Sequence, residues 1–517
     1  MADTVRDNYS TAEPYMGTRA SWLDTFSQRR VAAYDFYDDL CDNNPTAFKL
    51  LLRGDESNPI YVPTAKTIVK TLSRYVARDL GFAVSGDASA TETADAITAF
   101  GDLFKRERFF STFASGKRTG LRRGDQCIYV LANPLKPEGS RLSIRDMDPR
   151  TYFPIADETD PKRTTGADII DLVILEGNKQ AIRRQRYLRS TNPLHSTYPG
   201  PPPAVPSYDA PVEYLMEILE MENWQTQPKR IATIVPQAPL AAGIVNLPIY
   251  HIKYYEEGDL PFGRSCLQGL ERLMLGINQG ATDEDVALAM AGLGLFRSSA
   301  TPVDDNGDPT DWVIGPKRVV ETDDFERISG VPSVDPSQAH LKYLKDSAHE
   351  ATGVNDVALG NVDTSVAESG IALALRMGPL IDEAEEIDLV VSDVLTHLFY
   401  DLKTWLSAYE GINLADTAIV EPSFGPKLPR DMQKEFDHLM QMYTDGVVSL
   451  EYVHNTLREE FGMEIPKNEV ATIQAESEAA AAAADPFGTR LAQEAAGALA
   501  AGAGAQNGSA VDTSALV

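Results

Sequence analysis

The chain of 517 residues lacks long apolar runs and has only three cysteines. A membrane-spanning helix needs about 20 predominantly apolar residues, and no run here reaches 18, so the sequence predicts no such helix. Cys41, Cys127 and Cys266 lie far apart without CxxC spacing. This spacing excludes a disulfide framework and a zinc site and favours buried thiols in a reducing compartment. The first residues carry no basic segment followed by an apolar one, so we expect no secretory signal peptide.

Basic residues are scarce: 47 Lys and Arg stand against 76 Asp and Glu, and the net charge is −29. A protein that grips nucleic acid gains affinity by neutralising phosphates with basic side chains, so tight wrapping of DNA is disfavoured. Two interpretations of the acidity stay open. It serves solubility, or it forms an acidic wall past which a polyanion slides without sticking.

Catalytic and metal-binding motifs are also missing. The chain has no GxxxxGK[ST] loop, and GLGLFR at residue 292 lacks the third glycine of a dinucleotide-binding loop. Its seven histidines never adopt HExxH spacing. Asp304, Asp305 and Asp308 have the composition of a calcium loop in the wrong register, so a hairpin turn is expected. We therefore predict no enzyme activity, no catalytic residues, no metal site and no cofactor.

The periodicity of apolar residues predicts an α+β protein. Residues 20 to 110 are mostly helical in pattern, with one helix ended by Gly81, whereas period-two runs from Gln126 predict a mostly antiparallel sheet. The proline-rich stretch 192–211 is expected to be a surface insertion. A helix begins at Gly263, and GLFRSSA and DWVIGPKRVV are expected to flank a turn in a small β element. A further helix runs from about Ser337 to Ala351.

The most informative stretch runs from Gly353 to Tyr409. A polar loop leads into a helical pattern from about Val366, whose apolar residues recur in steps of three and four. Between Gly353 and Tyr400 there are nine acidic residues and one basic residue, Arg376. The acidic residues at 382–388 are interpreted as a solvated or subunit-facing stripe rather than a metal site. Gly378 and Pro379 predict a bend, because proline lacks the N–H that would bond to the carbonyl of Leu375.

Several phrases in this order resemble the portal proteins of tailed bacteriophages. They are GLRRGDQCIYVLAN followed by IRDMDPRTYFPI, then LPFGRSCLQGLERLMLGIN, ESGIALAL and PKLPRDMQKEFDHLMQMYTDGVVSLEYV. The resemblance covers about residues 30 to 475. It implies the portal fold, with wing, stem, clip and crown and a long kinked helix beside a central channel.

Carried onto this chain, the resemblance implies a division into nine parts. They are an N-terminal arm (1–29), the wing (30–262), a stem helix (263–292), the clip (293–337), a second stem helix (338–352), the tunnel loop (353–368), the long kinked helix with a return to the wing (369–429), crown helices (430–475) and an alanine-rich flexible tail (476–517). The expected site residues are Asn355, Asp356, Asn361, Asp363, Thr364 and Ser365 in the tunnel loop, Gly378 and Pro379 at the hinge, and Trp312, Lys317 and Arg318 at a clip interface between subunits.

The resemblance also implies function. Portal proteins form rings, typically of twelve subunits, at one capsid vertex, through which double-stranded DNA is packaged and ejected. The implied partners are other copies of the chain, DNA, the large terminase subunit, the major capsid protein and a head-completion or adaptor protein, with no membrane. The implied location is the virion, after assembly in the bacterial cytoplasm. Lys105, Arg106, Arg108, Arg118, Arg122 and Arg123 face acidic neighbours or capsid protein, or form a solvated patch. A monomeric acidic scaffold or adaptor and a cytosolic enzyme without a recognisable motif remain the alternatives.

Overall fold

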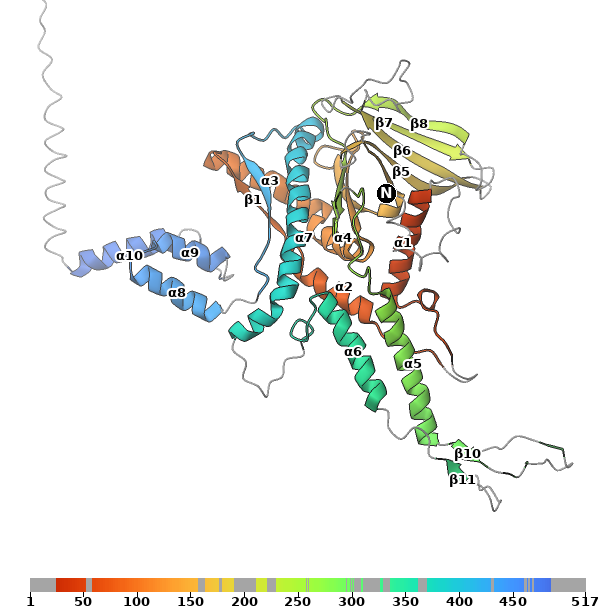
Figure 1. Ribbon diagram of the computed structural model, residues 1–517. Coiled ribbons are helices and arrows are strands. Elements are labelled where there is room, and N and C mark those ends of the chain that lie inside the picture. The colour runs from red at the N-terminus through yellow and green to blue at the C-terminus, as the bar shows by residue number, and fades with distance from the viewer. Residues whose placement is uncertain are drawn as a thin grey trace, which may run out of the picture. The chain divides into compact units, whose positions relative to one another are not determined.

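The computed structural model combines helices with antiparallel sheets, so the α+β prediction is confirmed (Figure 1). The chain divides into two compact units, Met1–Lys427 and Leu428–Val517. The structure describes residues 25–52, 58–156, 163–175, 179–189, 211–220, 229–256, 258, 260–293, 295–297, 299, 301, 308–309, 326–328, 335–360, 370–428, 432–459, 463, 465–466 and 469–484.

Four helices occupy the first part of the chain: α1 (Thr25–Asp42), α2 (Thr64–Tyr75), α3 (Ala90–Glu107) and α4 (Phe109–Arg123). Ser89 and Glu92 form a reciprocal capping box that fixes the start of α3. Phe104 packs on Phe109 and on Phe399, so an aromatic cluster joins α3 and α4 to a distant helix. Gly81 does not end α2 as expected, because the helix stops at Tyr75 and Gly81 begins a strand.

Two antiparallel sheets follow. The first has the order β3-β2-β9 and contains β2 (Asp125–Ala132), β3 (Leu142–Met147) and β9 (Ile249–Lys253). The second has the order β4-β5-β6-β7-β8 and contains β4 (Tyr152–Ala156), β5 (Thr164–Leu175), β6 (Lys179–Arg189), β7 (Val212–Glu220) and β8 (Lys229–Pro239). Tyr129, Tyr152, Tyr187 and Ile249 belong to one core cluster contributed by both sheets. The predicted antiparallel sheet domain is therefore present.

A short sheet connects distant parts of the first unit. Strand β1 (Gly81–Ser85) pairs antiparallel with β12 (Ile419–Ser423), which follows the long helix. More than 300 residues separate the paired strands, so no local turn signal could reveal them.

The expected stem helices are α5 (Glu271–Leu293) and α6 (Asp335–Ala351), which contact each other. Helix α5 begins at Glu271 rather than at 263, because residues 266–269 form turns and Gly269 has φ of 88°. Helix α6 begins at Asp335, a few residues earlier than expected. Between these helices, β10 (Leu295–Arg297) pairs with β11 (Glu326–Ile328). Strand β10 thus pairs with β11 rather than with the expected run at 311–320. That run lies outside the described residues.

The long helix α7 spans Gly370–Trp405, 36 residues, and continues as a π-helical turn over Leu406–Glu410. The second unit contains α8 (Met432–Thr444), α9 (Leu450–Glu459) and α10 (Glu469–Ala484). Leu439, Val453 and Leu457 form its small core. Helix α10 includes the alanine run at 479–484, which was expected to be a frayed helix at the start of the tail and has high intrinsic helix propensity. At the other end, α1 begins at Thr25, within the stretch from residue 20 that was expected to be mostly helical.

Candidate functional site

The turn at residues 352–360 is fastened to the N-terminal part of α7. The side-chain amide of Asn355 donates to the backbone carbonyl of Arg376, and Asn355 Oδ1 accepts from the backbone N–H of Ala358 at 2.8 Å. Gly353 has φ of 66°, and a Cβ there would lie 3.1 Å from the backbone of Pro379. The close approach therefore requires glycine.

Pro379 lies inside α7, and Figure 1 shows the ribbon of α7 changing direction near its N-terminal end. A proline inside a helix removes one backbone hydrogen bond and crowds the preceding turn. A Cβ placed on the adjacent Gly378 would meet no atom of another segment within 4 Å, so steric room does not explain this glycine. Its contribution to a bend is backbone freedom alone.

The structure places only part of the expected tunnel loop. Asn355 is half-buried and engaged with α7, whereas the side chain of Asp356 is exposed. The remaining expected residues, Asn361, Asp363, Thr364 and Ser365, lie outside the described residues. Asn355 is thus a positioning residue for the turn, and Asp356 is the exposed acidic residue among the described residues of this turn.

Buried charges anchor α7 to α2 and α4. Asp388 accepts from the backbone N–H of Ala77 at 2.6 Å and pairs with Lys427 at 2.5 Å. Lys117 of α4 donates to the carbonyl of Val76 at 2.5 Å. Burial lowers the pKa of Lys117 to about 8, although the negative charge of Asp388 acts to raise this pKa. These contacts fix the end of α2 against the middle of α7.

A second anchor lies at the end of α7. The carboxylate of Glu410 is almost fully buried and accepts from the backbone N–H groups of Gly139, Arg141 at 2.8 Å and Leu142 at 3.1 Å. Arg106 lies 3.7 Å from the same carboxylate. A buried carboxylate needs such partners, since its desolvation is costly. The β2–β3 connection is therefore held to the π-helical turn.

Helices α5 and α6 approach closely because α5 has glycine at the contact. A Cβ at Gly276 would lie 3.3 Å from Leu344, and one at Gly280 would lie 3.4 Å from Leu341. Gln338 donates to Glu284 at 2.8 Å across the same pair. The three residues expected at the clip interface, Trp312, Lys317 and Arg318, lie outside the described residues.

The basic residues of α3 and α4 divide into two groups. Arg122 and Arg123 both pair with Asp38 of α1, at 2.7 and 2.6 Å, so for them the solvated-patch interpretation was wrong. Arg106 is exposed but pairs with Glu107 at 3.1 Å and lies near Glu410, whereas Lys105, Arg108 and Arg118 are exposed. Arg123 also pairs with Asp148 at 2.9 Å, and Asp148 pairs with Arg150 at 2.6 Å. Burial alone would raise the pKa of Asp148, but the hydrogen bonds of Arg150 and the charge of Arg123 outweigh it and lower that pKa.

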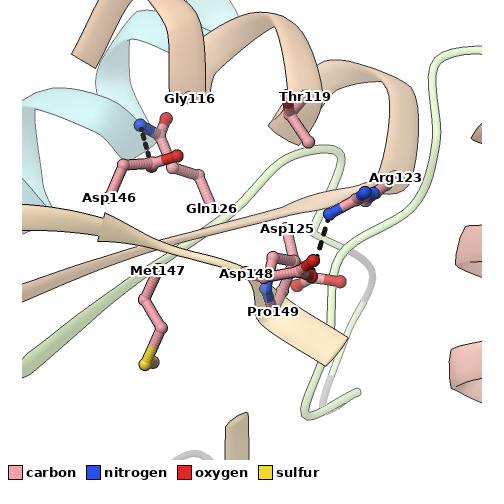
Figure 2. Close-up of a pocket in the computed structure, with 9 residues that line it drawn as sticks. All are labelled: Gly116, Thr119, Arg123, Asp125, Gln126, Asp146, Met147, Asp148 and Pro149. Carbon is pink, nitrogen blue, oxygen red and sulfur yellow. Dashed lines mark hydrogen bonds and ion pairs between the residues drawn. The ribbon is translucent and has the colours of Figure 1, made fainter. Parts of the chain in front are cut away.

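A cavity of about 300 Å³ lies beside this cluster, between α4, β2 and the β3–β4 connection (Figure 2). Figure 2 shows Arg123 directed at Asp148 and Gln126 directed at Asp146. The carboxylate of Asp125 already accepts from Tyr34 at 2.5 Å and contacts His251 at 2.7 Å. These contacts among the lining side chains join α4, β2 and the β3–β4 connection around the cavity.

The comparisons with known proteins give no family. No protein-family model matches the chain, and no curated protein is detectably similar to it. Within the described ranges, no group of three or more His, Cys, Asp or Glu side chains is placed to hold a metal ion. No described helix is long and apolar enough to cross a membrane. The three cysteines are unpaired and buried, as predicted, and burial raises the pKa of each thiol.

Proposed function

We propose that this chain is the portal, or head–tail connector, of a tailed double-stranded DNA bacteriophage. In this proposal it forms a closed ring at one capsid vertex, and DNA passes through the ring during packaging and ejection. The terminase, the major capsid protein and a head-completion protein attach to it. The proposal rests on the sequence resemblance together with one observation on the fold.

That observation is the exposure of α6, which contacts α5. All residues of α6 are described, and only Ala348 is buried, although the helix also carries Leu341, Tyr343 and Leu344. The pair is followed at its end by a sheet of two three-residue strands, β10 and β11, and isolated sheets of this size are marginal in water. Such elements gain stability when neighbouring copies cover them. A head-to-tail contact that closes on itself gives a ring.

The charge of the chain supports passage of DNA rather than its capture. Twelve copies at −29 each would carry about −350. The turn beside the bend of α7 presents Asp356 to solvent, and a carboxylate repels phosphate. An acidic channel would therefore centre the duplex and let it slide.

Negative-stain electron microscopy of the purified protein tests the proposal. The expected result is a population of ring-shaped particles with a central hole in views down the axis. Monodisperse particles of single-chain size, with no rings over a range of protein and salt concentrations, would favour a monomeric adaptor or an enzyme instead.

A further inference from the structure

Helix α2 has a narrow exposed edge that is entirely basic. Its three exposed residues are Lys66, Lys70 and Arg74, and the spacing of four places them on one face. Lys66 lies 3.9 Å from Asp42, whereas neither Lys70 nor Arg74 forms an ion pair within the described part of the chain. This edge carries no acidic residue, although the net charge of the chain is −29.

Two exposed leucines, Leu51 and Leu52, precede this edge in the chain, and the backbone of the first is bonded to α5. The backbone N–H and C=O of Leu51 both bond to the side-chain amide of Gln279 in α5, at 2.7 and 3.0 Å. Further along, Thr282 accepts from the backbone N–H of Ile60 at 3.0 Å. Leu51 is 69% and Leu52 is 54% exposed. Leu51, Leu52, Lys66, Lys70 and Arg74 are called the basic surface.

Helix α7 carries a surface of opposite charge. Asp382, Glu386, Leu389 and Asp393 are all exposed, and their spacings of four, three and four residues place them on one helix face. Leu375, which precedes the bend at Pro379, is exposed as well. Leu375 is 75% and Leu389 is 73% exposed. The carboxylate of Asp393 lies 3.8 Å from the ring nitrogen of His397 on the same helix, and this histidine is a cation only when it is protonated. These five residues are called the acidic surface.

One protomer cannot bring its own two surfaces together. Asp388, which contacts Ala77 just after α2, lies on the buried side of α7. At about 100° per residue, the centre of the acidic surface is more than a quarter turn away from Asp388. Figure 1 shows α7 and α5 on either side of α2. The two surfaces therefore face in different directions and suit a head-to-tail contact between copies.

The two surfaces match in length and in chemistry. At 1.5 Å per residue, Lys66 to Arg74 spans about 12 Å and Asp382 to Asp393 about 16 Å. Each surface combines three charges of one sign with two leucines. A surface that binds only phosphate has no use for exposed leucines, whereas a protein interface buries them with a gain of about 25 cal/mol per Å². The leucines thus favour a protein partner over nucleic acid.

We propose that the basic surface of one copy binds the acidic surface of the next copy around the ring. This inference rests on the proposed function, which supplies the closed ring. It assigns the exposed acidic stripe of α7 to the contact between subunits. The channel lining is then left to other acidic residues, among them Asp356.

Charge reversal tests the inference. One variant carries Lys66→Glu, Lys70→Glu and Arg74→Glu, and the other carries Asp382→Lys, Glu386→Lys and Asp393→Lys. Each alone places like charges opposite each other, and we expect association to weaken at least about tenfold in each. A control with Lys105→Glu, Arg108→Glu and Arg118→Glu makes the same charge change at exposed positions on α3 and α4 and should assemble normally.

Mixing the two variants is the decisive arm. In an alternating ring every interface is again complementary, so an equimolar mixture should recover particles of wild-type mass although neither variant forms them alone. Circular dichroism establishes that each variant is folded. As a measurement that needs no variant, 1 M NaCl should weaken wild-type assembly, because it shortens the Debye length to about 3 Å.

Four results would overturn the inference. If each variant alone forms rings of the same mass as the wild type, this contact is excluded and the proposed function is unaffected. Failure of two folded variants to reassemble on mixing would also exclude it. A third result is that the variant at Lys66, Lys70 and Arg74 forms intact rings and binds a 30-base-pair DNA duplex more weakly than the wild type does. That result would show that the basic surface binds nucleic acid. A wild-type protein that forms no ring would remove the proposed function as well.

Discussion

The side-chain amide of Asn355 bonds to the backbone carbonyl of Arg376, three residues before Pro379. Pro379 cannot donate to the carbonyl of Leu375, so the contact from Asn355 is made in the helical turn where the proline removes a backbone hydrogen bond. A residue expected only to face the channel therefore fastens the turn to the bend in α7.

Replacing Asn355 by Ala should release the turn. The variant loses one donor and the acceptor for the N–H of Ala358, so we expect a loss of about 1–2 kcal/mol in the free energy of unfolding. Limited proteolysis within residues 353–360 should also accelerate. Asp356→Ala is the control, since its exposed side chain should change stability by less than about 0.5 kcal/mol. Equal stability of both variants would show that the Asn355 contact is unimportant.

Glu410→Ala should be among the more damaging single substitutions. It leaves three backbone N–H groups without their acceptor, of which that of Leu142 is buried, and we expect a loss of about 2–4 kcal/mol by urea denaturation. Glu410→Gln keeps one acceptor oxygen and should lose less. Similar stability of the wild type and Glu410→Ala would mean that water replaces the carboxylate.

The carboxyl group of Asp146 should make the free energy of unfolding depend on pH. Its Oδ1 accepts a hydrogen bond from Gln126 at 3.0 Å. Burial raises the pKa of the carboxyl from 3.8 to about 6, although this hydrogen bond acts to lower it. The folded state thus holds the proton more tightly than the unfolded state, and this stabilising contribution is lost as pH rises from about 4 through about 6. Asp146→Asn resembles the protonated form and keeps the acceptor.

We therefore expect Asp146→Asn to be more stable than the wild type at pH 8, by about 1 kcal/mol after allowing for solvent screening of a partly exposed group. The difference should shrink towards zero near pH 4. Denaturation curves at the two pH values measure it. An equal difference at both pH values would contradict the assigned ionisation.

Under the proposed portal function, substitutions in the loop expected at residues 353–368 should change the rate of DNA passage. Asp356→Lys combined with Asp363→Lys should create about one or two salt-sensitive phosphate contacts per subunit and slow packaging. Asp95→Lys combined with Asp102→Lys makes the same charge change on the exposed side of α3 and should package at the wild-type rate. Packaging rates in a reconstituted system at several salt concentrations make the comparison. An unchanged rate and salt dependence in the tunnel-loop variant would place the loop away from the DNA path.

Local patterns predicted the elements that have clear periodicity. The runs at 126–132 and 180–189 are strands, and the apolar steps from Leu373 predicted the long helix. Strands β4 and β8 were missed because each contains proline, which normally argues against a strand. The pairing of β1 with β12 depends on a contact across the whole first unit, which no local pattern reveals.

The candidate site was predictable only in part. Glycine and proline marked the turn and the hinge, because backbone geometry follows directly from these residue types. The Asn355–Arg376 contact was not predictable, since it joins a side chain to a backbone carbonyl 21 residues away. The buried carboxylates of Asp388 and Glu410 were likewise hidden within an acidic helix, where charge alone suggests solvent exposure.

The mass of the assembled particle tests the central claim most directly. Light scattering on the purified full-length protein separates a single chain of 56.5 kDa from a ring, for which about twelve copies would give roughly 680 kDa. The account predicts a discrete species near the larger value at moderate salt. A single species at the mass of one chain, unchanged on concentration, would contradict it.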